Sequence, residues 1–174
     1  MSNLNQRLAK GQEPAFVELY DQFGDQLFAY VVSRVTDSDS AKDIIQEVFA
    51  RLIRYHRHFK RVQNVRAYLF QVTRNEIARW STNKPTRSDS DTDSIPSEPV
   101  APNNLEESEW ISTLLSKLGD EDREIVSLKI FSELTFKELA DIFEMPAATV
   151  ATRYRRAIAK LEASLNEETA QDDG

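Results

Sequence analysis

The chain has 174 residues, a formal net charge of −7, four glycines and no cysteine. This length allows one medium-sized domain or two small ones. The absence of cysteine excludes disulfide frameworks and thiolate metal sites, and the low glycine content argues against turn-rich all-β folds. The longest apolar runs are too short to span a bilayer, and residues 1–10 lack the apolar core of a signal peptide. We therefore expect a soluble, intracellular (cytoplasmic) protein without membrane insertion.

Basic residues are concentrated in two segments, although the chain as a whole is acidic. Between residues 51 and 84 the only acid is Glu76, and the basic residues are Arg51, Arg54, Arg57, Lys60, Arg61, Arg66, Arg74, Arg79 and Lys84. The second segment, 147–161, has no acid and contains Arg153, Arg155, Arg156 and Lys160. Contact with phosphates depends on such local patches, so the negative net charge does not exclude nucleic-acid binding.

Helical periodicity predicts three helices in a first block from about Leu4 to Trp80. The first begins near Pro14, a residue that a first helical turn tolerates. The second is predicted to start at Ser40, which forms a capping-box pattern with Asp43. The polar and basic stretch 56–64 is predicted to be a loop, and the third helix covers 65–80.

A segment of different composition, 82–104, separates the two blocks. It contains Pro85, Pro96, Pro99 and Pro102 among Ser, Asp and Thr residues, so it cannot bury enough apolar surface to offset the entropy of ordering. We interpret it as an interdomain linker. Its acids have two open interpretations, as mimics of RNA charge in a basic channel or as solubilising residues of a spacer; these acids are Asp89, Asp91, Asp93 and Glu98.

Four further helices are predicted in the second block, which runs from Leu105 to about Leu165. The first contains Trp110, Leu114, Leu115 and Leu118 and ends near Gly119, the second covers 120–131, the third runs from a capping box formed by Thr135 and Glu138 to Phe143, and the fourth covers 147–165. No strand pattern or internal repeat is evident. The predicted fold is all-α, with two small helical domains (1–81 and 105–166) joined by the flexible linker 82–104. The acidic residues 167–174 are predicted to form a disordered tail.

The last two helices of this block have the pattern of a helix-turn-helix. In the final helix Val150, Tyr154, Ala157, Ile158 and Leu161 project to one side, and Thr149, Thr152, Arg153, Arg156 and Lys160 to another. The second helix of such a motif enters the major groove of DNA, where Arg reads guanine and Thr contacts phosphate or a thymine methyl. The alternative is a solvated basic face on an ordinary helical hairpin.

Three segments resemble the extracytoplasmic-function sigma factors of bacterial RNA polymerase. Residues 134–161 (LTFKELADIFEMPAATVATRYRRAIAKL) resemble region 4, 41–52 (AKDIIQEVFARL) resemble region 2.2, and 65–78 (VRAYLFQVTRNEIA) resemble regions 2.3 and 2.4. Three positions depart from the family pattern: Ala151 replaces a usual Lys or Arg, Ala148 a usual Gly, and Tyr68 a usual Trp. The promoter sequence therefore cannot be transferred from relatives.

The resemblance implies that the chain binds core RNA polymerase, through the β′ coiled coil and the β flap, and promoter DNA. It leaves open an anti-sigma factor as a further partner, and it implies no cofactor and no metal. The residues implied for β′ docking are Asp43, Gln46 and Glu47. Those implied for the minus-ten element are Phe59, Lys60, Arg61, Gln63, Asn64, Arg66, Tyr68, Arg74, Asn75 and Arg79, and those for the upstream, minus-thirty-five element are Thr149, Thr152, Arg153, Arg155, Arg156 and Lys160.

Several of these residues have a plainer explanation. The polar residues implied for docking could be merely solvated, and Phe59 and Tyr68 could pack in the core. Two other functions were considered: a DNA-binding regulator that acts without docking on polymerase, and an enzyme such as a nuclease. The second would need clustered carboxylates or a paired histidine base, whereas His56 and His58 lie in a basic segment without a nearby acid. We therefore expect the chain not to be an enzyme.

Overall fold

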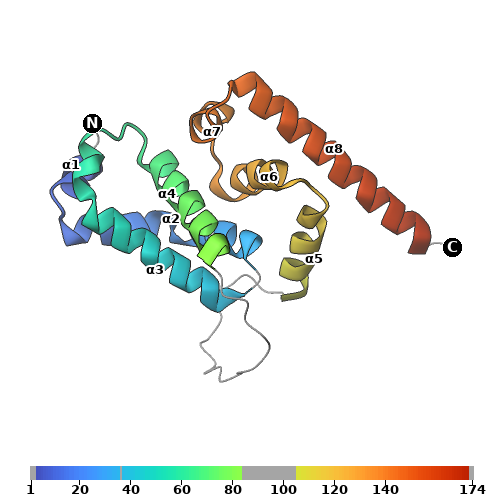
Figure 1. Ribbon diagram of the computed structural model, residues 1–174, viewed down its shortest axis with the longest axis horizontal. Coiled ribbons are helices and arrows are strands. Elements are labelled where there is room, and N and C mark those ends of the chain that lie inside the picture. Colours follow the sequence, from blue (N-terminus) through green and yellow to red (C-terminus); the bar gives the residue numbers. More distant parts are fainter. Residues whose placement is uncertain (1–2, 36, 84–104, 173–174) are drawn as a thin grey trace.

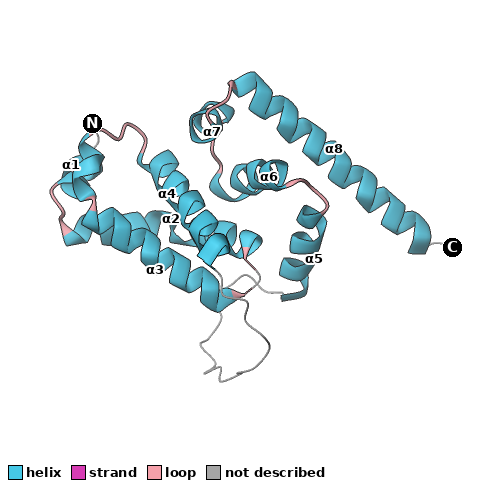
Figure 2. Ribbon diagram, in the orientation of Figure 1, coloured by secondary structure: helices cyan, strands magenta, loops and turns pink. Residues whose placement is uncertain are grey.

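The computed structural model describes residues 3–35, 37–83 and 105–172, with side chains in the last range from Trp110 to Gln171. Every regular element in these ranges is a helix (Figure 2). In chain order they are α1 (Asn3–Ala9), α2 (Glu13–Arg34), α3 (Ser38–Arg54), the 3₁₀ helix η1 (His56–Lys60), α4 (Val65–Asn83), α5 (Leu105–Ser116), α6 (Asp120–Ser132), α7 (Phe136–Phe143) and α8 (Ala147–Asp172). The all-α prediction is confirmed for the described residues.

The starts of the first helices follow local chemistry. Pro14 lies in the first turn of α2, as predicted. The turn before it needs Gly11, because its φ of +70° is strained for other residues and an added Cβ would make a tight contact of 3.3 Å with the His56 ring. The predicted start of α3 at Ser40 is wrong. Asp37 is the N-cap and accepts a hydrogen bond of 2.7 Å from the Ser40 backbone N–H, so Ser40 is the third residue of the helix.

The stretch 56–64, predicted as a loop, begins with the helix η1. Its Phe59 ring is buried and meets the rings of Phe16 and Tyr68 edge-on, at centroid distances of 6.2 and 5.4 Å. His56 is held at the same place by a 2.9 Å hydrogen bond to the Ala9 carbonyl. An aromatic anchor therefore folds this basic stretch back onto α1, α2 and α4, and the sequence pattern underestimated its order.

The helix-turn-helix forms as predicted. The Thr135 hydroxyl accepts from the Glu138 backbone N–H at 3.1 Å, and the Glu138 carboxylate accepts from the Thr135 N–H at 2.7 Å. Helix α7 ends at Glu144 in the left-handed conformation, and α8 begins after Pro146. The predicted inner face of α8 is buried: Ala157 and Leu161 pack in a cluster with residues of α5 and α6, and Val150 packs in the cluster that contains Leu139 and Phe143 of α7.

The C-terminal segment differs from the prediction. Helix α8 continues to Asp172 instead of ending near Leu165, so residues 167–172 are helical and not a disordered tail (Figure 1). An ion pair between Lys117, which follows α5, and Glu168 supports this extension. Because the pair joins positions 51 residues apart in the chain, helical periodicity alone could not indicate it.

The two helical parts pack directly on each other. Helix α6 lies against α2, and α7 lies against α4 (Figure 1). One continuous apolar cluster includes Leu27, Tyr30 and Phe70 from the first part and Leu139 and Phe143 from the second. Residues 84–104, where the linker and its alternative roles were predicted, lie outside the described residues.

Removal of the Thr135 hydroxyl should weaken the helix-turn-helix. Since N-cap Ser or Thr to Ala changes cost about 0.5–2 kcal/mol, Thr135→Ala should lower the free energy of unfolding by about 1 kcal/mol in urea titrations followed by circular dichroism. The control is Thr169→Ala, whose exposed hydroxyl bonds only to carbonyls of its own helix. That change should stay within about 0.5 kcal/mol of the wild-type value. Equal losses in the two variants would contradict the capping role.

Candidate nucleic-acid interface

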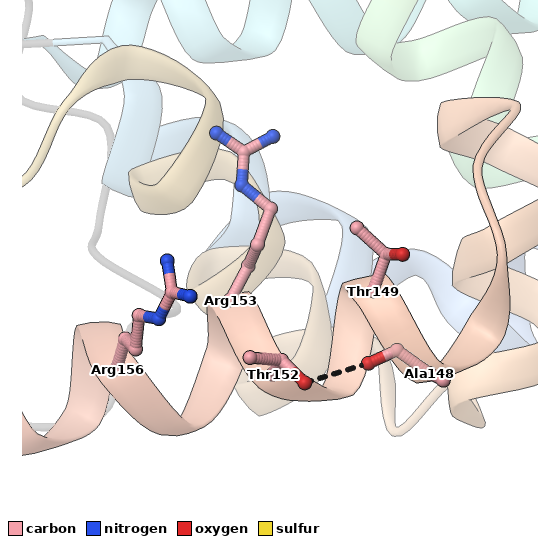
Figure 3. Close-up of a pocket in the computed structure, with 5 residues that line it drawn as sticks. All are labelled: Ala148, Thr149, Thr152, Arg153 and Arg156. Atoms are coloured by element: carbon pink, nitrogen blue, oxygen red, sulfur yellow. Dashed lines mark hydrogen bonds between the residues drawn. The ribbon is translucent and has the colours of Figure 1, made fainter.

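The outer face of α8 carries the residues predicted for the upstream element. Thr149, Arg155, Arg156 and Lys160 are exposed, and Thr152 and Arg153 are half-buried. An open depression of about 530 Å³ lies on this face, lined by Ala148, Thr149, Thr152, Arg153 and Arg156 (Figure 3). The structure therefore brings four of the six predicted residues, Thr149, Thr152, Arg153 and Arg156, into the lining of one surface. Arg155 lies on the helix outside that depression.

Two residues of this face are already engaged. The Thr152 hydroxyl donates to the Ala148 carbonyl at 2.9 Å, within α8 (Figure 3). Arg153 pairs with two acids of α6, donating to Glu121 and lying 2.9 Å from Asp122. The hydrogen bond to Glu121, with the charges of both acids, raises the pKa of Arg153. Arg156 forms no ion pair with another described residue, so its guanidinium is the more available of the two.

A second basic surface follows η1 and α4. Lys60, Arg61, Gln63, Asn75 and Arg79 are exposed, which fits a role in contacting DNA. Arg79 is 54% exposed although it lies 3.3 Å from Glu76. Glu76 itself is buried and binds Arg51 at 2.7 Å, so this acid neutralises an arginine of the first basic segment from within the fold.

The side chain of Phe59 is buried in the core, and that of Tyr68 is half-buried beside it. The Phe59 ring is 1% exposed, so in this conformation it cannot stack on a base. Tyr68 is half-buried, and desolvation raises the pKa of its hydroxyl. Core packing is therefore the favoured interpretation of Phe59. A DNA contact by that residue would require η1 to rearrange.

The three residues predicted for docking share one exposed face of α3. Gln46 and Glu47 follow Asp43 by three and four positions, so both lie one helical turn from Asp43. Beside them a groove of about 270 Å³ runs between α2 and α3, lined by Tyr20, Phe28, Lys42, Ile45, Gln46 and Phe49. Tyr20 meets Phe49 edge-on at 5.4 Å and is still 53% exposed. Lys42 is the one charged residue in the lining of the groove, and the exposed acids Asp43 and Glu47 form an acidic rim next to Gln46 on α3. A largely apolar groove with polar residues around it is typical of a protein-binding surface.

Sequence analysis missed the acids that cover part of the α4 surface. Glu138 of α7 accepts hydrogen bonds from Asn64 and, at 3.3 Å, from Arg66. Glu124 of α6 lies 2.9 Å from Arg74 and accepts from the Tyr30 hydroxyl at 3.4 Å. Three residues predicted to contact the minus-ten element are therefore bound to carboxylates of the second helical part. The capping pattern identified Glu138 as a helix-start residue, but no local signal indicates a partner some 70 residues away.

The pKa shifts at this contact have clear causes. Burial alone would raise the pKa of Glu138, but hydrogen bonds from Thr135 and Asn64 and the charge of Arg66 outweigh it, so the pKa falls below its ordinary value. Burial raises the pKa of Tyr30 well above its ordinary value, and the adjacent Glu124 adds to the effect. Around neutral pH Glu138 is thus ionised and Tyr30 is a neutral hydrogen-bond donor.

Comparison with known proteins shows the family of the chain. The family model for Sigma-70 region 2 matches residues 19–84, and that for Sigma-70 region 4 matches 108–161. The ECF RNA polymerase sigma factor EcfG of Rhodopseudomonas palustris (strain TIE-1) is 30% identical over 153 residues, which cover 85% of this chain and 83% of that protein. The chain belongs to the ECF family of RNA polymerase sigma factors. It is therefore a transcription initiation factor that directs polymerase to promoters.

Solved structures of sigma factors share this fold. The structure of CnrH in complex with the cytosolic domain of CnrY matches with a TM-score of 0.75 and 21% identity, over 94% of this chain and 96% of that chain. The sigma factor RpoE in complex with the anti-sigma factor NepR, from Bartonella quintana, matches with a TM-score of 0.66 and 22% identity, over 87% and 96%. These similarities place both helical parts of the chain in the fold of sigma factors.

Two searches of the described residues gave negative results. No helix in the described ranges is long and apolar enough to cross a membrane. Among the same residues, no group of three or more His, Cys, Asp or Glu side chains could hold a metal ion.

The burial of Phe59 leads to a stability prediction. Phe59→Ala should lower the free energy of unfolding by about 3–5 kcal/mol, because it leaves a cavity among Phe16, Tyr68 and their neighbours. The measurement is urea unfolding followed by circular dichroism. Tyr55→Ala, an aromatic change at a 49% exposed position of the same segment, is the control and should cost less than about 1 kcal/mol. A similar small loss for Phe59→Ala would show that its ring is not part of the core.

Proposed function

We propose that the α8 face reads the minus-thirty-five element of a promoter as duplex DNA, and that the surface of η1 and α4 binds and opens the minus-ten element. The observation that carries the proposal is that one chain presents two separate basic surfaces, one on α8 and one on η1 and α4, together with an exposed docking face on α3. A regulator without polymerase docking needs only the first of these three surfaces.

At the upstream element, Arg156 is the best candidate for a base contact. Its guanidinium is exposed on the helix that follows the turn of the helix-turn-helix, and a bidentate Arg–guanine pair is a common specific contact. Since the Thr152 hydroxyl donates its proton within α8, we assign Thr152 a contact through its methyl group or oxygen lone pairs. Lys160, farther along the helix, fits a phosphate contact that positions the domain.

At the minus-ten element, Asn75 is the best candidate for recognising an unpaired base. It is exposed on α4, and an amide can hydrogen-bond the edge of a base that has left the stack. Extrusion of a base costs a few kcal/mol. Cations that bind the backbone of the open strand offset part of this cost, and Lys60, Arg61 and Arg79 are exposed near Asn75 on the surface of η1 and α4.

Docking on core polymerase is assigned to the α3 face and the adjacent groove. The acidic rim of Asp43 and Glu47 fits a basic partner surface, and the exposed Tyr20 edge offers an aromatic anchor. We assign the β′ coiled coil to this face and the β flap to the second domain. An anti-sigma protein is a further partner, supported by the complex of RpoE with NepR.

The protein is proposed to act without catalysis of its own, in the cytoplasm, where core polymerase and the promoter are. The domain limits 1–81 and 105–166 remain part of this proposal. They are supported by the two separate family matches at 19–84 and 108–161.

Charge reversal tests the docking face. Asp43→Lys/Glu47→Lys should abolish co-purification with core polymerase, because it changes an exposed acidic rim to a basic one, while helical content stays normal. The control is Glu162→Lys/Glu167→Lys, which introduces the same charge at exposed positions of α8 and should leave core binding unchanged. Normal core binding by the α3 variant would refute the assignment.

Single substitutions separate the two DNA contacts. Arg156→Ala should weaken promoter binding by the holoenzyme by about 1–3 kcal/mol and relax preference only in the upstream element. Asn75→Ala should spare that preference and reduce strand opening, measured by permanganate reactivity of unpaired thymines. If Asn75→Ala instead altered upstream preference and left opening intact, the mapping of the two surfaces would be wrong.

A further inference from the structure

Glu76 is the single acid in the basic segment 51–84, and its side chain is buried, with 8% exposed. A carboxylate that is removed from water is stable only where cations or hydrogen bonds compensate its charge. The helical pattern of α4 does not require an acid at this position, and DNA binding alone would disfavour one. The contacts of this carboxylate therefore indicate what it does.

Two arginines from two helices meet at one oxygen of the carboxylate. The Glu76 Oε1 atom lies 2.7 Å from Arg51 Nε of α3 and 3.3 Å from Arg79 Nη1 of α4. These two helices pack against each other (Figure 1). Arg51 Nε is buried and forms no aligned hydrogen bond, so its attraction to Glu76 is mainly that of opposite charges. One buried acid is thus shared by two cations.

The two cations differ in their surroundings. The Arg51 side chain is 26% exposed and also lies 3.5 Å from Glu47, the farther and more exposed of its two acids. The Arg79 side chain is 54% exposed, so its pair with Glu76 does not serve to bury it. Because Arg51 already compensates much of the charge of Glu76, this acid can hold Arg79 without cancelling the positive charge of the surface.

The held cation lies beside the residue that is proposed to recognise an unpaired base. Asn75 and Arg79 are four positions apart on α4 and both are exposed, so they lie one turn apart on the same face. A base that leaves the stack remains attached to its phosphates, so an amide for the base and a cation for the backbone are useful side by side. Arg79 faces Glu76 through Nη1, and the other N–H donors of its guanidinium remain for a phosphate.

Holding Arg79 in advance favours binding. An arginine side chain has many rotamers, and ordering it when a partner binds lowers the affinity. We propose that Glu76 is a positioning residue of the minus-ten surface, which holds the Arg79 guanidinium beside Asn75 where it can bind a phosphate of the open strand. This inference rests on the proposed function of α4. It explains why a buried acid lies within a basic segment.

The alternative is that Glu76 only fastens α3 to α4 through Arg51. Three substitutions separate the two roles: Glu76→Gln removes the charge and keeps the size, Arg79→Gln removes the held cation, and Arg57→Gln is the matched control. Arg57 is an exposed cation of the same basic segment and forms no ion pair with another described residue. Circular dichroism and thermal unfolding verify that the variants are folded.

The first measurement is nitrogen-15 relaxation of the arginine Nε–H groups in the full-length chain. We expect the order parameter of Arg79 to lie well above that of Arg57, and to fall to the Arg57 level in Glu76→Gln. Equal order parameters for Arg79 and Arg57 in the unmodified chain would overturn the proposal, whether or not Glu76→Gln folds. Polymerase and promoter are absent from this experiment, so its result does not depend on the proposed function.

The second measurement is strand opening by the reconstituted holoenzyme, followed by permanganate reactivity of unpaired thymines. We expect Glu76→Gln to reduce opening about fivefold, the effect of ordering one long side chain on binding, and Arg79→Gln to reduce it at least as much. The double variant should open no less than Arg79→Gln alone, because both changes remove the same contact. Arg57→Gln should leave opening near the wild-type level, and its effect should add to that of Glu76→Gln.

The outcomes distinguish this inference from the function on which it rests. Unchanged opening by Arg79→Gln would overturn the proposed contact of Arg79 with the open strand. Reduced opening by Arg79→Gln with normal opening by Glu76→Gln would overturn only the positioning role. Additive losses from Glu76→Gln and Arg79→Gln would show that Glu76 acts by fastening α3 to α4, and would overturn the proposal as well.

Discussion

The Glu138 carboxylate is the interaction on which the arrangement of this protein most depends. It accepts the Thr135 backbone N–H and so starts α7, the first helix of the helix-turn-helix. The same carboxylate also binds Asn64 and Arg66 of the other domain. One side chain therefore caps the first helix of the helix-turn-helix and also holds it against the first helical part. Few other positions in the chain connect local folding and domain placement so directly.

The ionisation of Glu138 follows from these contacts and determines how the contact responds to pH. Because its pKa is lowered in the folded chain, the charged form binds more favourably there than in the unfolded chain. The resulting stabilisation is complete above the ordinary pKa of a glutamate and is lost as the pH falls through the lower folded value. Near neutral pH the carboxylate is ionised, so the contact is insensitive to small pH changes.

Sequence patterns predicted the local features of this structure and missed those that join distant residues. Helical periodicity identified α2 to α8 and the inner face of α8, because both follow from spacings of three and four residues, but it did not indicate the short helices α1 and η1. The α7 capping box was found for the same reason. Phe59 was harder to interpret, because its burial depends on Phe16 and Tyr68, which belong to other helices. The cations Arg66 and Arg74 were correctly recognised as basic residues, but their partners on α6 and α7 depend on the tertiary fold.

The charge distribution becomes intelligible once these partners are known. A freely exposed basic surface would attract any nucleic acid in the cell, since binding of this kind depends little on sequence. In the structure, acids of α6 neutralise Arg153 and Arg74, and Glu138 neutralises Arg66. Ion pairs that are partly exposed are individually weak, on the order of 1 kcal/mol or less, so a partner that offers several phosphates in a fixed geometry can displace them together. An acidic net charge is therefore compatible with basic surfaces for DNA, because part of the acid is spent on ion pairs within the fold that a phosphate backbone can replace.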